Sequence, residues 1–202
     1  MERVFTGLYE NSVWGDNSSS EYRGSSGDGS ALSYNVNIYI PFLRKVFAAK
    51  EIKRVVDLGC GDFRCGQAIY GDLDIEYIGY DAYRQVVEAN ARRYPRPKYD
   101  FCHLDFHMYK EELAEGDMCI LKDVIQHWSV QDINVFLDYL VASKKYKYIL
   151  ICNCCSQSYP NADIATGGWR PLTCNMEPLR KYNATILGKY NTKEVAVIGW
   201  DN

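Results

Sequence analysis

Apolar runs and amphipathic stretches alternate along most of the chain. Short runs rich in Val, Ile and Tyr predict strands, whereas apolar positions spaced by three or four residues predict helices. The predicted strands are 54–59, 75–81, 99–106, 117–124 and 147–155, and the helices between them are 64–71, 82–94, 108–114 and 130–143. Strands that alternate with helices in this way predict a parallel sheet with helices on both faces.

The pattern differs near the two ends of the chain. Residues 183–200 hold two β-rich runs around a turn, which predicts a hairpin and therefore one antiparallel strand. Before the first strand, apolar positions from Leu32 to Phe47 predict a helix interrupted at Pro41. The predicted fold class is therefore α/β: a doubly wound, seven-stranded, mostly parallel, Rossmann-like sheet. Its ligand is expected at the carboxyl ends of the strands.

Residues 11–30 are rich in Ser, Gly and Asp and poor in aliphatic side chains, which predicts a flexible arm. Trp14, Tyr22 and Arg23 are costly residues for a simple spacer, so we expect the arm to contact a ligand as a lid. A length of 202 residues suits one domain, 1–202, with an N-terminal arm at 1–30 and a core at 31–202.

Composition narrows the classes of partner. A formal net charge of −3 and a pI near 5.7 give no basic footprint, which makes nucleic acid an unlikely partner on sequence grounds. The chain has no apolar run of about 18 residues and no secretion pattern at its start, so we expect no membrane partner and a cytoplasmic location. The sequence leaves the oligomeric state open. Eight cysteines fit reduced thiols, and the Cys-rich run 152–155 favours buried thiols at a strand end over zinc.

The stretch VVDLGCGDFRCG at 55–66 ends a predicted strand in a glycine-rich turn. Its glycine spacing differs from the dinucleotide fingerprint, so NAD is disfavoured. Asp57 precedes the glycines and would repel a pyrophosphate but attract an ammonium or a sulfonium. Asp81 and Asp105 follow the next two strands, where they could accept hydrogen bonds from ribose hydroxyls and from an adenine amino group.

These motifs, together with the run DMCILKDVIQHW at 117–128, resemble in order and spacing those of class I S-adenosylmethionine-dependent methyltransferases. The closer resemblance, through WG, SSGDGS and DIATGGWRPL, is to small methyltransferases of bacteria and large algal viruses, some linked to surface-glycan synthesis. The resemblance implies S-adenosylmethionine as cofactor and S-adenosylhomocysteine as product. The cofactor-binding residues that it implies are Asp57, Gly59, Cys60, Gly61, Asp81, Ala82, Leu104, Asp105 and Lys122.

Methyl transfer to a hydroxyl benefits from a general base. Asp123 and His127 stand four residues apart where a helical turn begins, so both could face one pocket. His127 could be the base with Asp123 orienting it, or Asp123 could itself act as binder or base. Aromatic faces with Asp and Arg suit a sugar, which makes a carbohydrate the expected acceptor. The candidate substrate-binding residues are Trp14, Trp128, Asp163, Trp169 and Arg170. We predict no metal, since few acids cluster there.

The sequence therefore predicts an O-methyltransferase of a sugar hydroxyl, in a glycan or a nucleotide sugar. Two alternatives stay open: a methyltransferase of a small metabolite, protein or RNA, and a non-catalytic module that binds the cofactor or a partner. The complete set of motifs counts against the second.

Overall fold

The computed structural model describes residues 1–18, 20–94, 97–156 and 162–200. Its strands form one seven-stranded sheet in the order β3-β2-β1-β4-β5-β7-β6. The strands are β1 (Arg54–Leu58), β2 (Glu76–Asp81), β3 (Tyr99–His103), β4 (Gly116–Lys122), β5 (Tyr146–Cys154), β6 (Thr185–Tyr190) and β7 (Lys193–Ile198). Strands β1 to β5 pair in parallel, whereas β7 is antiparallel to both β5 and β6. The predicted fold class is confirmed, including the C-terminal hairpin.

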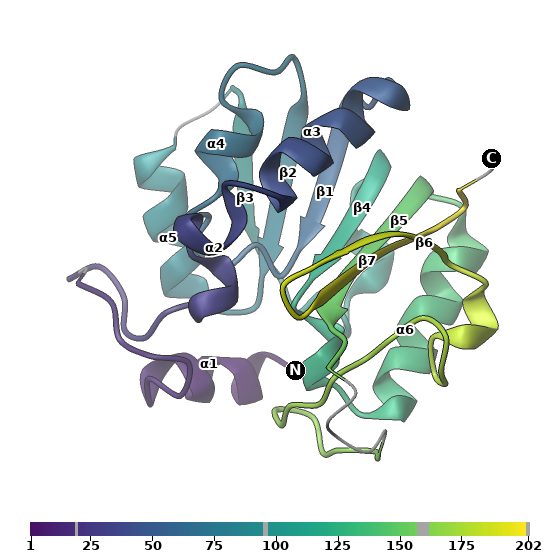
Figure 1. Ribbon diagram of the computed structural model, residues 1–202. Helices are drawn as coiled ribbons and strands as arrows, with labels where there is room; N and C mark the ends of the chain where they lie inside the picture. Colours follow the sequence, from purple (N-terminus) through teal and green to yellow (C-terminus); the bar gives the residue numbers. More distant parts are fainter. Residues whose placement is uncertain (19, 95–96, 157–161, 201–202) are drawn as a thin grey trace.

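Helices cover both faces of the sheet (Figure 1). The α-helices are α1 (Glu2–Glu10), α2 (Leu32–Asn35), α3 (Tyr39–Ala49), α4 (Gly66–Tyr70), α5 (Arg84–Arg93) and α6 (Val130–Ser143), and the 3₁₀ turns are η1 (Asp28–Ser30), η2 (Lys110–Glu112), η3 (Ile125–His127) and η4 (Arg180–Tyr182). Alternate residues of β1 serve two cores: Val55 packs on the side of α3, α4 and α5, and Val56 on the side of α6.

Two local helix predictions need correction. The predicted helix 108–114 is only the 3₁₀ turn η2, because Leu113 is buried while Met108 and Tyr109 are exposed, so the segment has too little apolar surface to bury. The helix before β1 is broken upstream of Pro41, between α2 and α3. Pro41 itself lies in the first turn of α3, where its missing N–H costs no helical bond.

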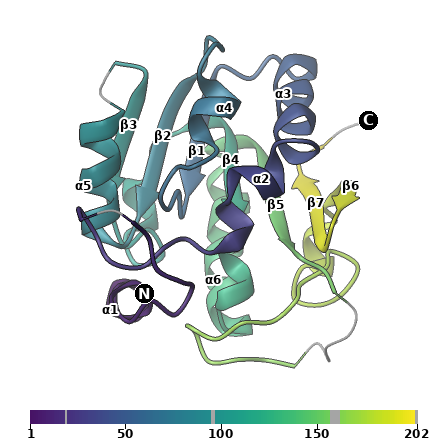
Figure 2. The ribbon, with the colours of Figure 1, turned by 60° about the vertical axis from the view of Figure 1, so that its left-hand side comes forward.

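The N-terminal segment packs against the sheet and is more structured than the predicted flexible arm. It begins with α1, which lies along the lower edge of the molecule in Figure 1, and Figure 2 shows the following loop running from α1 to α2. Tyr22 and Ser25 in this loop are buried. Phe5 and Tyr9 of α1 line the same cavity as Gly61 and Asp81, so α1 lies at the carboxyl edge of the strands.

Candidate active site

A cavity of about 350 Å³ opens at the carboxyl edge of the sheet, between the strand ends and the N-terminal segment. Most predicted site residues line it: Trp14, Asp57, Gly59, Cys60, Gly61, Asp81, Ala82, Asp105, Lys122, Asp123, His127, Trp128 and Trp169. Three do not belong to its wall: Leu104, Asp163 and Arg170. The sheet thus brings together acids that are far apart in the sequence.

The turn after β1 gives a ligand access to bare backbone. Gly59 and Gly61 have φ values of 80° and 53°, in the left-handed region that favours glycine. A Cβ on Gly59 would lie 2.5 Å from Cγ2 of Val124, so no larger residue fits between the turn and the end of β4. Side chains are excluded here by both conformation and space.

Asp57, at the end of β1, is a carboxylate suited to a cationic partner. The Tyr77 hydroxyl donates to its Oδ2 at 2.8 Å. Burial raises the pKa of Asp57 to about 6, although Tyr77 and Lys122 both act to lower it. A ligand ammonium beside this carboxylate would favour its ionised form.

Asp81 and Asp62 place further acceptors around the same turn. Asp81 accepts from the N–H groups of Gly61 and Tyr83, each at 2.9 Å, and burial raises its pKa. Asp62 accepts from the N–H of Ser26 at 3.2 Å through Oδ2, while its buried Oδ1 has no hydrogen-bond partner among the described residues. A buried acceptor without a donor on the cavity wall fits a ligand that brings N–H or O–H groups.

Asp105 is engaged by the start of the chain. The amino group of Met1 lies 2.9 Å from Oδ2 of Asp105, and the N–H of Glu2 donates to the same oxygen at 2.8 Å. The N–H of Met108 donates to Oδ1 at 3.2 Å. The expected contact between Asp105 and an adenine amino group stays a prediction.

His127 is held in one tautomer. Its Nδ1 lies 2.8 Å from the carbonyl oxygen of Gly168, and because a carbonyl can only accept, Nδ1 carries the proton. Its Nε2 is then the basic nitrogen, and the side-chain Nε2 of Gln126 lies 3.4 Å from it, as a donor that an acceptor hydroxyl would have to replace. Burial lowers the pKa of His127 and outweighs the opposing effect of the Gly168 bond, so the ring is neutral near pH 7. The ring lies 5.1 Å from that of Trp14.

Asp123 does not orient His127, contrary to the expectation from their spacing. Its carboxylate pairs with Lys122, at 2.9 Å, and with Lys193 at the start of β7. Although burial acts in the opposite direction, the two lysines hold the pKa of Asp123 below its usual value. Asp123 also has a φ of 61°, uncommon for a residue with a side chain, while its N–H donates to Cys152 at 2.8 Å. The carbonyl of Gly168 takes the orienting role instead.

A family comparison identifies the family of the chain. A family model described as an O-methyltransferase domain matches residues 18–176, which is most of the chain. The chain belongs to this O-methyltransferase family. The matched segment includes the glycine-rich turn, the acids that follow β1 and β2, and His127. The protein is therefore a methyltransferase.

Solved structures support the methyltransferase fold. Magnesium protoporphyrin IX methyltransferase from Synechocystis PCC 6803, solved with bound SAH, superposes with a TM-score of 0.63 at 9% identity over 98% of each chain. Human N-acetylserotonin methyltransferase, solved with SAM, gives 0.57 at 14% identity over 79% of this chain and 54% of the other, so our chain spans about half of that enzyme. The 16S rRNA methylase ArmA gives 0.55 at 17% identity, over 82% of this chain and 83% of that one. A sequence search of curated proteins found no match.

The three candidate tryptophans differ in how far their side chains are exposed to solvent. Trp14 is half-buried and Trp169 is 42% exposed, and both line the cavity. Trp128 is 1% exposed, and its ring packs against those of Phe106 and Phe136 at 5.9 and 5.2 Å. The structure thus places Trp128 in the core, in contrast to the expected substrate-binding role.

Asp163 and Arg170 form a structural clamp of the O-methyltransferase instead of the expected sugar contacts. Asp163 accepts from the first N–H of α6, that of Val130, and from Nη1 of Arg170, both at 2.8 Å. Buried Arg170 also donates to the carbonyl of Trp128 at 2.9 Å. The side chains of Asp163 and Arg170 are thus bonded to each other and to the backbone of Val130 and Trp128, although Nε of Arg170 has no hydrogen-bond partner among the described residues. Asn161 of the run 161–172 lies outside the described residues. Likewise, Leu104 donates its N–H to the Asp81 carbonyl at 3.0 Å instead of reaching the cavity.

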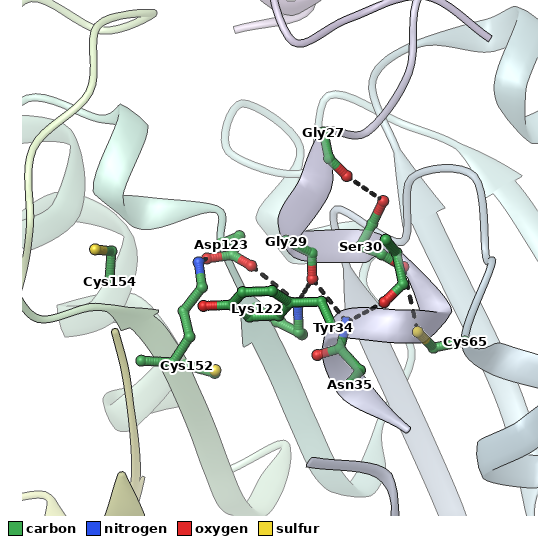
Figure 3. Close-up of polar contacts among 12 residues, drawn as sticks. Gly27, Gly29, Ser30, Tyr34, Asn35, Cys65, Lys122, Asp123, Cys152 and Cys154 are labelled. Atoms are coloured by element: carbon green, nitrogen blue, oxygen red, sulfur yellow. Dashed lines mark hydrogen bonds and ion pairs between the residues drawn. The ribbon is translucent and has the colours of Figure 1, made fainter. Parts of the chain in front are cut away.

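Sequence reasoning missed Ser26, Gly29 and Lys193 of the cavity wall. Ser26 donates its N–H to Asp62 and accepts the Asp62 N–H at 2.9 Å, which fixes the loop 25–30 over the glycine-rich turn. Figure 3 shows Gly29 beside Lys122 and Asp123. The run SSGDGS contributed to the family resemblance, but its hydrogen bonds with Asp62 join residues 36 positions apart. No local sequence pattern indicates such a contact.

The described residues form neither a metal-binding cluster nor a membrane-spanning helix. Within the described ranges, no group of three or more His, Cys, Asp or Glu is placed to hold a metal ion. No helix in that part of the O-methyltransferase is long and apolar enough to cross a membrane.

Proposed function

We propose that the protein is an S-adenosylmethionine-dependent O-methyltransferase of a sugar hydroxyl, and that residues 1–202 form one domain with 1–30 covering the site. The observation that carries the proposal is the fixed tautomer of His127, which points to proton removal from a hydroxyl. The family match supports the methyl transfer, and the neighbours solved with SAM or SAH support the cofactor.

The residues at the ends of β1 and β2 fit the cofactor. Asp57 would take its ammonium, the backbone at Gly59 and Gly61 its methionine end, and Asp81 its ribose hydroxyls. When bound, S-adenosylmethionine supplies a methyl group on a positively charged sulfur. The unpartnered Oδ1 of Asp62 supports a ligand rich in donors at this place.

His127 supplies the base. Its neutral Nε2 would remove the proton from the acceptor hydroxyl, and bound S-adenosylmethionine would supply the methyl group to that oxygen, with S-adenosylhomocysteine as the second product. General-base catalysis contributes a factor of about 10² to 10⁴. The proton then leaves His127 to solvent. Burial keeps the pKa of His127 low, so the base is ready at neutral pH.

A sugar is the acceptor that we propose, because Trp14 and Trp169 offer aromatic faces at the cavity. Such faces pack well against the C–H face of a sugar ring. The net charge of −3 argues against RNA, the substrate named for one structural neighbour.

The test is methyl transfer measured as S-adenosylhomocysteine release, with sugars, phenols, nucleosides and RNA as acceptors. His127→Asn should lower kcat by about 10² to 10⁴ while calorimetric affinity for S-adenosylmethionine is unchanged. In the wild type, kcat should fall as pH drops below the lowered pKa of His127, and this dependence should be absent from the variant. A chelator should leave the rate unchanged.

His103→Gln is the matched control, since His103 lies outside the cavity wall. Its kcat should stay within about twofold of the wild type. An unchanged kcat in His127→Asn contradicts the role of His127. If only phenols, nucleosides or RNA are methylated, the sugar proposal is wrong.

A further inference from the structure

A charged cluster that the proposed chemistry does not use lies beside His127. It consists of Lys122 and Asp123 at the end of β4 and Lys193 at the start of β7, and we call it the lysine–aspartate cluster. All three residues line the cavity. Figure 3 shows Lys122 and Asp123 with Gly29 of the N-terminal loop against them. A Cβ on Gly29 would lie 2.8 Å from Oδ2 of Asp123 and 3.4 Å from Nζ of Lys193, so the loop closes tightly over the cluster.

The two lysines differ in how fully their ammonium groups are used. Lys122 donates to the carbonyl of Gly29 at 2.7 Å and to Asp123 at 2.9 Å, and its Nζ lies 5.5 Å from the ring centre of Tyr39. Lys193 is buried, and across the described residues its hydrogen-bond partner is Asp123. An ammonium has three N–H donors, so Lys193 keeps donors that can face the cavity.

The cluster carries a charge of +1, from two ammonium groups and one carboxylate. Elsewhere on the cavity wall, Arg64 is paired with Asp62 and the amino group of Met1 with Asp105, each at 2.9 Å. Lys122 also acts on Asp57, but Asp57 and Asp81 belong to the ends of β1 and β2, where the ammonium of the cofactor is proposed to balance the charge of Asp57. At the β4 and β7 end, the positive charge exceeds the negative, and a buried excess charge is costly unless a ligand compensates it.

We propose that Lys193 makes this end of the cavity an anion subsite, so that the preferred acceptor carries a carboxylate or a phosphate group as well as the methylated hydroxyl. The proposal rests on the proposed function and names its substrate class. Lys193 acts as a specificity-determining residue: its ammonium binds the acid group of the acceptor, while His127 serves the hydroxyl.

Binding of matched compounds tests the subsite without requiring turnover. The protein saturated with S-adenosylhomocysteine is titrated calorimetrically with glucose, glucuronate and glucose 6-phosphate, and with phenol and 4-hydroxybenzoate. An acid should bind at least about tenfold more tightly than its neutral counterpart, as expected for a charge-assisted hydrogen bond. Comparison of glucuronate with glucose 6-phosphate distinguishes a carboxylate from a phosphate, and the phenol pair covers a non-sugar acceptor.

Lys193→Gln removes the charge but keeps a donor for Asp123, and it should abolish the preference for acids. Lys45→Gln, an exposed lysine on α3 away from the cavity, is the charge-matched control and should keep it. Equal binding of acids and neutral compounds to the wild type overturns the proposal, and so does a preference that persists in folded Lys193→Gln. The wild-type comparison needs no variant, so it decides even if Lys193→Gln does not fold.

The same compounds separate the two proposals. Methylation of neutral and acidic acceptors with equal kcat/KM would refute the anion subsite and leave the O-methyltransferase function standing. Acid-selective binding that is lost in Lys193→Gln, without methyl transfer to any hydroxyl, would support the subsite and refute the proposed function.

Discussion

Replacing Asp57 by asparagine should stabilise the ligand-free protein while abolishing cofactor binding. Burial raises the pKa of Asp57 to about 6 from an ordinary value of 3.8. The folded protein therefore holds this proton more tightly than the unfolded chain, and the ionised carboxylate destabilises the fold. This destabilisation is fully present above pH 6 and disappears as the pH falls below 3.8. Asparagine carries no charge and can still accept the hydrogen bond from Tyr77.

The size of the effect follows from the two pKa values. Their difference corresponds to about 3 kcal/mol of unfolding free energy at pH 7.5. At pH 5 the folded wild type is mostly protonated at Asp57, and the advantage of the variant should shrink to about 1.5 kcal/mol. Urea unfolding of both proteins at the two pH values measures this difference, and calorimetry with S-adenosylmethionine measures the loss of binding.

Asp117→Asn provides a control of opposite sign. Although partial burial acts in the other direction, Lys147 and the N–H groups of Lys53 and Arg54 hold the pKa of Asp117 below its usual value. Asp117→Asn should therefore lower stability at pH 7.5, with a smaller effect at low pH. If Asp57→Asn is less stable than the wild type at pH 7.5, or if its advantage is the same at both pH values, the electrostatic account of Asp57 is wrong.

Two further predictions concern candidate substrate-binding residues. Asp163→Ala should lower the unfolding free energy by about 1 to 2 kcal/mol, because the bond that caps α6 is lost, and kcat should be unchanged. A melting curve and a rate assay measure the two quantities, and a large fall in kcat without loss of stability would contradict this prediction. Trp169→Ala should raise KM for the acceptor with little change in melting temperature, whereas Trp128→Ala should lower the unfolding free energy by about 3 to 5 kcal/mol. Urea unfolding and steady-state kinetics measure these effects, and their reversal would refute the placement of Trp169 at the acceptor and of Trp128 in the core.

The grouping of the residues proposed to hold the cofactor in one cavity was predictable from the sequence because its parts are local. Asp57, Gly59 and Gly61 belong to one turn, and Asp81 ends the next strand, so the rule that ligands bind at the carboxyl ends of parallel strands was sufficient to bring them together. Helix α1 could also have been predicted, because Val4, Phe5 and Leu8 are spaced as on one helical face. The prediction instead placed these residues only in the N-terminal arm at 1–30.

The acceptor side was not predictable in the same way. Lys193 reaches Asp123 across 70 positions of sequence, and no local pattern signals such a pair. Asp163 and Arg170 had suitable chemistry for a sugar, but they satisfy each other and the start of α6. A composition typical of binding sites cannot reveal whether polar groups are already paired within the chain.

The placement of β7 between β5 and β6 has a consequence for the order in which the site is assembled. The partners Asp57 and Tyr77 are 20 positions apart, on adjacent strands from the first half of the chain. Lys193 is synthesised later and reaches Asp123 only when β7 inserts beside β5. During synthesis from the N-terminus, the groups proposed to hold the methyl donor are therefore available well before the group proposed to select the acceptor. Any nascent chain that lacks the hairpin also lacks Lys193 and, with it, the proposed means of discriminating among acceptors.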